Sequence, residues 1–339
     1  ALTFVAELDE ATIARVRREA LALRIRHRTS VTVELHYVAD VAATALIATL
    51  ADLATHEVQI VTAPIGGGTT STAIPAAQPR PAAPTSEPDP FGLDREFRAR
   101  SLPLFRFMFE RYWRIAVSGM ENVPATGPAL VVANHSGAVP ADAFMLAAAL
   151  ELRHLEPRCL RVLFDKFVDA LPFIGDLYRR LGGVTASFAN AELLLRQGGL
   201  VGLFPEGIAG VEKLCTERYR LRPFKTGTAR LSLRTGSPIV PVAIVGAEEA
   251  YPVIARLYRA GQLVGLPWIP VTPLFPVCGL AGGLPLPSKW AMHFGPPILP
   301  PPADGRSEDE RVAELTARVR AAIETSLHRL LAKRGGIFL

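Results

Sequence analysis

Cysteine is scarce in this sequence: there are three in 339 residues, Cys159, Cys215 and Cys278. They lie far apart, form no Cys-x-x-Cys pair and are odd in number, so they support neither a metal cluster nor a disulfide framework. We therefore expect no metal site, and thiols that stay reduced as in the cytosol.

Apolar runs that could form a membrane-spanning helix are also missing. The nearest candidate, residues 260–288, carries no charge but contains six prolines, which a helix cannot accommodate. Acidic residues at positions 7, 9 and 10 differ from the basic start of a signal peptide. We expect a peripheral or monotopic protein at the cytoplasmic face of a membrane, which touches the bilayer without crossing it by a simple helix.

Aromatic residues make up only 7% of the chain, although hydrophobic residues reach 49%. The formal net charge is +5, which suits a nucleic acid, an anionic membrane or simple solubility. The arginines lie among Phe, Trp and Leu, and no nucleic-acid recognition motif is present. This pattern favours a membrane surface and predicts no nucleic-acid partner; the oligomeric state is left open.

Residues 93–114 combine large apolar side chains with six arginines and three acids. A basic amphipathic segment with aromatics is typical of the headgroup layer of a membrane. The alternative is an ordinary helix that docks on its own domain and leaves its arginines in water. We expect Pro103 to break the helix, because proline removes a hydrogen bond and clashes with the preceding turn.

The chain has three parts of different composition. Residues 1–62 show helix patterns at 9–23 and 40–53 and strand patterns at 31–38 and 58–61, which predicts a small α/β unit of unknown role. Residues 63–90 are rich in proline and alanine and predict a flexible linker. Residues 91–339 form the main domain.

The main domain alternates apolar strand patterns with helix patterns. This order predicts the α/β class, with a mostly parallel sheet flanked by helices, because fully apolar strands are buried on both faces. The expected strands are 129–133, 160–164, 200–204, 239–245 and 291–294. The expected helices are 141–152, 171–181, 189–197, 226–235 and 307–333, the last opening on a capping box of Ser307 and Glu310 and packing back on the domain.

Two polar clusters follow apolar strands. Asn134, His135, Ser136 and Gly137 come after the first strand, and Asp142 lies at the start of the next helix. Catalytic groups in open α/β sheets are presented at such strand ends. A histidine with a carboxylate in reach can act as a general base, while the carboxylate fixes its tautomer; a structural histidine is the alternative.

The second cluster is Phe204, Pro205, Glu206 and Gly207, at the end of another apolar strand. Glu206 could meet His135 across the edge of the sheet; a buried or capping glutamate is the alternative. Lys225 precedes a helix whose free amides could hold phosphate groups, or it is a solvated lysine at a helix start.

Together these clusters resemble the motifs of the glycerophospholipid acyltransferase superfamily, which includes the 1-acyl-glycerol-3-phosphate acyltransferases. The family's Asn-His followed by Asp is matched by Asn134, His135 and Asp142, and its Phe-Pro-Glu-Gly by residues 204–207. A later strand rich in valine and proline is matched by residues 238–242. The resemblance covers about residues 93–335.

The resemblance implies a mechanism. His135 would deprotonate an acceptor hydroxyl, which attacks an acyl thioester directly, and Asp142 would orient the imidazole. The donor would be acyl-CoA or an acyl-carrier-protein thioester, the acceptor a lysophospholipid or other glycerolipid, and no cofactor or metal would be needed. We expect the substrate-binding residues to be Asn134, Ser136, Gly137, Phe204, Pro205, Glu206, Gly207 and Lys225.

The sequence also departs from the family pattern. Six residues separate His135 from Asp142 where the family usually has four, so two must loop out. The arginines credited with binding the acceptor's phosphate are absent: residues 182–188 contain none, and Ile208-Ala209 follow the second motif. Other basic residues could replace them, or the acceptor is neutral, such as diacylglycerol or a long-chain alcohol. The candidate replacements are Arg179, Arg180, Lys213, Arg218 and Lys225.

Three further alternatives concern function. Residues 263–287 carry prolines three apart, which suits polyproline II and either lipid contact or a buried connection. An α/β hydrolase would need a Gly-x-Ser-x-Gly elbow, which is absent, and Ser136 has no such frame. A non-catalytic lipid-binding relative finds its only support in the irregular spacing of His135 and Asp142.

Overall fold

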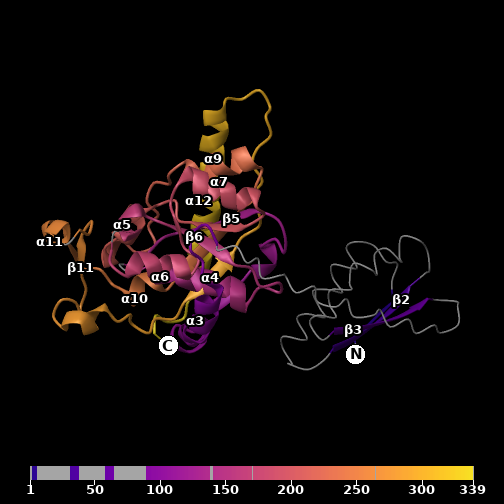
Figure 1. The fold of residues 1–339 in the computed structure, drawn as a ribbon, viewed down its shortest axis with the longest axis horizontal. Helices are drawn as coiled ribbons and strands as arrows, with labels where there is room; N and C mark the ends of the chain where they lie inside the picture. Colours follow the sequence, from indigo (N-terminus) through magenta and orange to yellow (C-terminus); the bar gives the residue numbers. More distant parts are fainter. Residues whose placement is uncertain are drawn as a thin grey trace. The chain divides into compact units, whose positions relative to one another are not determined.

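The computed structural model describes residues 2–5, 31–37, 58–64, 89–137, 140–169, 171–263 and 265–338 (Figure 1). The chain divides into two compact units, Ala1–Glu87 and Pro88–Leu339.

The first unit contains a parallel sheet of three strands in the order β1 (Leu2–Val5), β2 (Val31–Tyr37) and β3 (Val58–Pro64). The strand patterns at 31–38 and 58–61 correspond to β2 and β3, whereas β1 was not predicted. The helix patterns at 9–23 and 40–53 lie outside the described residues. So does most of the predicted linker at 63–90, although β3 extends two residues into it.

A seven-stranded sheet organises the second unit, in the order β4-β12-β9-β5-β8-β6-β7. Neighbours from β9 through β7 run parallel, and only β12 pairs antiparallel, with β9. The prediction of a mostly parallel α/β sheet is therefore confirmed. The strands are β4 (Ala116–Ser118), β5 (Ala129–Ala133), β6 (Leu160–Phe164), β7 (Val184–Thr185), β8 (Leu200–Leu203), β9 (Ile239–Val245) and β12 (Ala291–Phe294).

Helices cover both faces of this sheet. Figure 1 shows the sheet between one layer of α7, α9 and α12 and another of α3 and α4. Each layer encloses a core, one around Trp113, Met145 and Trp290 and the other around Leu195, Leu315 and Ile323. The bounds are α3 (Arg95–Phe107), α4 (Ala141–Leu152), α5 (Lys166–Asp169), α6 (Ile174–Arg180), α7 (Phe188–Arg196), α8 (Ile208–Val211), α9 (Gly227–Thr235), α10 (Ala247–Ala250) and α12 (Glu308–Lys333).

The last helix follows its prediction closely. Ser307 caps α12, and the capping box with Glu310 is formed. The helix packs back on the sheet as predicted, since Val312, Leu315, Val319, Ile323 and Leu327 along one face are buried.

The segment 93–114 differs from the prediction, because Pro103 does not end the helix. Helix α3 continues through Pro103 to Phe107 and is followed by a π-helical turn, η2 (Met108–Tyr112). Pro103 and Ala99 are both exposed, so the carbonyl that loses its partner faces water. Phe109 and Trp113 are buried in the core. The segment therefore docks on the domain mainly through the residues that follow α3, whereas Leu104 and Phe107 of α3 itself are exposed.

Residues 263–287 also differ from the prediction, because they do not form a continuous polyproline II helix. Strand β11 (Ile269–Val271) pairs antiparallel with β10 (Ala255–Leu257), helix α11 (Tyr258–Leu263) lies between them in the chain, and a 3-10 turn, η5 (Gly279–Gly283), follows. Within the described ranges, no helix has the length and apolar character needed to cross a membrane.

Candidate active site

The two polar clusters meet at one edge of the sheet. Strands β5 and β8 are parallel neighbours, so their carboxyl ends lie side by side and carry His135 and Glu206 to the same place. The main-chain N–H of His135 donates to Oε1 of Glu206 at 2.9 Å. The glutamate therefore holds the backbone of the histidine rather than its ring.

The imidazole of His135 is bonded to Asp142. Nδ1 lies 2.8 Å from Oδ2 of the carboxylate, whose side chain is 0% exposed while that of the histidine is 14% exposed. The main-chain N–H groups of Ser136 and Ala143 also donate to this carboxylate, at 2.9 and 2.8 Å. The six-residue separation is thus accommodated: Asp142, in the first turn of α4, reaches the ring, and Gly137 in the connecting loop has a φ of +81°.

Two neighbours fix the position of the histidine. The ring of Phe204 stacks on the imidazole, with centroids 4.2 Å apart and planes at 24°. Asn134 is fully buried, and its side-chain amide donates to the carbonyl of Ile244 and accepts from the N–H of the same residue. These bonds extend the pairing of β5 with β9 by one residue, so Asn134 holds the loop rather than facing a substrate. Ser136 is also buried, and its hydroxyl has no partner within the described part of the chain.

A buried ion network lies behind Glu206. Oε2 of Glu206 accepts from the main-chain N–H of Arg222 at 2.7 Å and lies 3.5 Å from Nζ of Lys213. The same Nζ lies 2.9 Å from Oε1 of Glu248. Burial raises the pKa of Glu248 above its usual value, against the opposing effect of Lys213. Sequence reasoning found no role for Glu248 and considered Lys213 only as a phosphate ligand.

Helix α8 lies directly against the histidine. A Cβ on Gly210 would come within 2.8 Å of Cβ of His135 and 2.9 Å of Cβ of Glu206. Gly207, at the start of α8, has a φ of +58°, which favours glycine. Sequence reasoning missed Gly210. The only signal for its role is that it is a glycine within a helix of four residues.

Lys225 and Pro205 lie beside the second cluster. The main-chain N–H of Lys225 donates to the carbonyl of Pro205 at 2.9 Å, and a Cβ on Gly207 would meet Nζ of Lys225 at 3.0 Å. The hollow next to them measures about 10 Å³, room for one water at most. A phosphate does not fit into this hollow in the conformation described.

The other basic residues proposed as phosphate ligands have carboxylate partners. Arg179 pairs with Asp169, and Arg180 with Asp94. Lys213 lies in the network described above, and Arg218 is 3.7 Å from Glu249. Of the five candidates, only Lys225 has no ion pair within the described residues.

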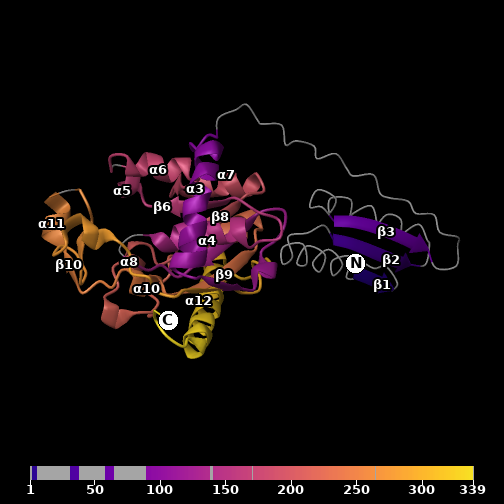
Figure 2. The ribbon, with the colours of Figure 1, turned by 90° about the horizontal axis from the view of Figure 1, so that it is seen from below.

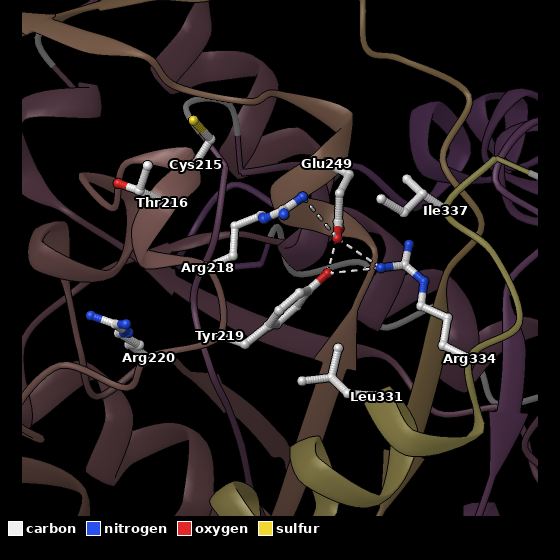
Figure 3. A pocket seen from close by; sticks show the side chains of 9 residues that line it. All are labelled: Cys215, Thr216, Arg218, Tyr219, Arg220, Glu249, Leu331, Arg334 and Ile337. Atoms are coloured by element: carbon white, nitrogen blue, oxygen red, sulfur yellow. Dashed lines mark hydrogen bonds and ion pairs between the residues drawn. The ribbon is translucent and has the colours of Figure 1, made fainter.

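A larger hollow of about 390 Å³ is lined in part by Cys215, Tyr219 and Arg334 (Figure 3). Glu249 lies between Arg218 and Arg334 and accepts from Arg334 at 2.7 Å and from the hydroxyl of Tyr219. None of His135, Asp142 and Glu206 lines it. The bond of Arg334 to Glu249 joins the end of α12 to α10. Because none of the candidate catalytic residues lines this hollow, it is separate from the candidate active site.

Comparison with known proteins shows which family this chain resembles. A family model described as Acyltransferase matches residues 114–245. An uncharacterised protein of Mycobacterium tuberculosis is 44% identical over 254 residues, which cover 74% of this chain and 71% of that protein. The human "DGAT1/2-independent enzyme synthesizing storage lipids" is 27% identical, with 61% of this chain and 60% of that protein covered.

Two further similar proteins are named as acyltransferases that act on a phosphorylated acceptor. The 1-acyl-sn-glycerol-3-phosphate acyltransferase of Borreliella burgdorferi is 27% identical, over 50% of this chain and 64% of that protein. The crystal structure of the 1-acyl-sn-glycerophosphate (LPA) acyltransferase PlsC from Thermotoga maritima aligns with a TM-score of 0.44 and 20% identity, covering 72% of this chain and 85% of that one.

The class of protein is thus an O-acyltransferase of the glycerolipid type, which transfers acyl groups to lipid acceptors. The chain belongs to the glycerophospholipid acyltransferase superfamily.

Proposed function

We propose that this protein transfers a fatty acyl group from a thioester donor to the hydroxyl of a lipid, with His135 as the general base. The observation that carries the proposal is the 2.8 Å contact between Nδ1 of His135 and the buried carboxylate of Asp142. A carboxylate in this position selects the tautomer with hydrogen on Nδ1, which leaves the lone pair of Nε2 free to accept a proton.

The reaction proceeds without a covalent acyl-enzyme. Nε2 of His135 takes the proton of the acceptor hydroxyl as its oxygen attacks the thioester carbonyl. Asp142 stabilises the imidazolium that forms. When the tetrahedral intermediate collapses, the carbon–sulfur bond breaks, and the imidazolium returns the proton to the leaving thiolate. The products are the ester and the free thiol of coenzyme A or of an acyl-carrier protein.

A neutral acceptor has the better support. Four of the five basic residues that could replace the missing arginines are paired with carboxylates, so their charges are already compensated. One relative is named for the synthesis of storage lipids, whereas another is named for a 1-acyl-glycerol phosphate. We therefore infer diacylglycerol or a long-chain alcohol as acceptor, with a lysophospholipid as the second candidate. All three acceptors are lipids that partition into membranes, which suits a peripheral protein at the cytoplasmic face.

The test is the release of free thiol from palmitoyl-CoA by the full-length protein, with diacylglycerol, hexadecanol and lysophosphatidic acid offered separately. We expect turnover with a neutral acceptor and a loss of about 10²–10⁴-fold in the His135→Ala variant. Turnover with lysophosphatidic acid alone would overturn the neutral acceptor. Equal rates in the variant would overturn the mechanism, and no turnover with any acceptor, with palmitoyl-carrier protein tried as well, would favour a non-catalytic relative.

A further inference from the structure

Residues 254–287 form a projecting arm that contains β10, α11, β11 and η5. Both views show α11 and its neighbouring strands extending beyond the layered body of the Pro88–Leu339 unit (Figures 1 and 2). The arm is fixed at its base: the main-chain N–H of Leu286 donates to the carbonyl of Ala250 at 2.8 Å, and the guanidinium of Arg256 donates to that of Glu212 at 2.9 Å.

The arm also has its own internal packing. Trp268 is buried, and a Cβ on Gly261 would come within 2.5 Å of its main chain. The hydroxyl of Thr272 accepts the N–H of Phe275 at 3.0 Å and closes the turn after β11. These contacts hold the arm in one shape, so its surface is a defined feature of the fold.

Large apolar side chains gather on the surface of the arm. Of the sixteen that are exposed among the described residues, seven lie here. Leu263, Val277 and Leu284 are 88%, 86% and 67% exposed. An exposed concentration of this kind marks a surface that another apolar phase covers. The remaining four are Ile254, Leu257, Tyr258 and Leu274.

The charge of the arm indicates which phase that is. No aspartate or glutamate occurs between Glu249 and Asp304, and the arm's only charged residues are Arg256 and Arg259. Apolar side chains with arginine and without acids complement a bilayer whose headgroups are anionic. A second copy of the chain fits less well, since a two-fold contact would bring like charges together with no carboxylate on the arm to pair them.

The arm starts beside the candidate active site. The main-chain N–H of Cys215 donates to the carbonyl of Val253 at 2.7 Å, and Arg256 is bonded to the residue that ends α8. Helix α8 in turn packs against His135 through Gly210. A membrane that receives the arm therefore lies near the edge of the sheet that carries the histidine.

We propose that the arm inserts its apolar side chains into an anionic bilayer and so holds the reaction edge at the lipid surface. The supply of lipid acceptor to His135 rests on the proposed function, whereas the binding of the arm to vesicles does not.

The test measures flotation of the full-length protein with vesicles of phosphatidylcholine alone and with added phosphatidylglycerol. The double variant Leu263→Asp/Val277→Asp should bind the anionic vesicles about tenfold less or weaker still, because two side chains lose their burial in lipid and gain charge. Leu299→Asp is the matched control: Leu299 is 65% exposed but lies outside the arm, and its variant should bind like the wild type.

A second variant tests the charge. Arg259→Glu should weaken binding to vesicles that contain phosphatidylglycerol by about fivefold or more, and should change binding to pure phosphatidylcholine much less. Unchanged flotation of both arm variants would overturn the proposal. So would a wild-type dimer that fails to float and that the double variant dissociates, measured by light scattering, because a second copy would then cover the arm.

Thiol release tests the proposed acyl transfer, and flotation tests membrane binding by the arm, so the two proposals can fail independently. Thiol release with a water-soluble short-chain acceptor should be normal in the arm variants, because His135 and its neighbours are unchanged. Normal release together with normal flotation would remove the arm's role and leave the chemistry standing. If the wild type floats with vesicles but releases no thiol, membrane binding by the arm stands and the proposed acyl transfer is wrong.

Discussion

Lys213 lies between the two buried carboxylates of Glu206 and Glu248, and its single charge serves both. Removing a proton from Glu248 costs free energy in this setting, because burial raises its pKa above the ordinary value of 4.5. The folded protein thus keeps this proton over a pH range in which the unfolded chain has released it. In that range the free energy of unfolding falls as the pH rises.

The variant Glu248→Gln should show this effect. Its side chain cannot ionise and keeps an oxygen next to Nζ of Lys213, so its Tm should be close to that of the wild type below pH 4.5 and should exceed it increasingly above that pH. Calorimetry across the pH range measures the difference, with Glu324→Gln, on an exposed part of α12, as control. A difference that does not change with pH would show that packing, and not ionisation, separates the two proteins.

At the scale of elements, α8 sets the distance between the histidine and the rest of the site. A methyl group on Gly210 would lie 2.8 Å from Cβ of His135, so Gly210→Ala must displace α8 or the histidine. We expect a loss of stability of about 1–3 kcal/mol and a loss of turnover of about tenfold or more.

A matched glycine shows whether the effect is local. Gly227 begins α9, and a Cβ there would meet nothing within 4 Å. Gly227→Ala should therefore be neutral or stabilise the protein by up to about 1 kcal/mol, with normal turnover. Thermal unfolding and thiol release measure both variants, and equal losses in the two would contradict the close packing at Gly210.

Elements with a strong local pattern were predictable from the sequence. Strands β5 and β9 are apolar throughout because both of their faces are buried, and the bounds of 129–133 and 239–245 were correct. Strands β4 and β7 were missed, since three and two residues carry too little pattern and depend on pairing with distant strands. Pro103 was misjudged because its tolerance depends on which side of α3 faces water.

Some residues of the candidate site could likewise be predicted from a local sequence pattern, and others could not. His135 and Glu206 could be predicted because each follows an apolar strand, and parallel neighbours bring strand ends together. The ion pair of Lys213 with Glu248 joins residues with no local signal for one another. The pairing of Arg179 with Asp169 and of Arg180 with Asp94 likewise needed coordinates, and it is this pairing that favours a neutral acceptor.

On the scale of the whole molecule, an ion pair at the start of the Pro88–Leu339 unit decides where the chain can be cut without loss of stability. Asp89 lies at its start and accepts from the guanidinium of Arg161 at 2.7 Å and from the N–H groups of Phe91 and Leu93. Burial acts to raise the pKa of Asp89, but these bonds outweigh it and hold the pKa below 3.8. The side chain of Arg161 is buried, so this carboxylate compensates a charge that water reaches poorly.

Two truncated chains should therefore behave differently. A chain that begins at Pro88 keeps the ion pair and should retain the Tm of the second unit and the rate of thiol release. A chain that begins at Leu93 leaves Arg161 unpaired and should be less stable by about 3–5 kcal/mol at neutral pH. The difference should shrink as the pH falls through the lowered pKa of Asp89, because stability from a depressed carboxyl is present above 3.8 and lost below it. Chemical denaturation of both chains at neutral and acid pH measures this, and equal stability at neutral pH would mean that the unit begins after the Asp89 contact.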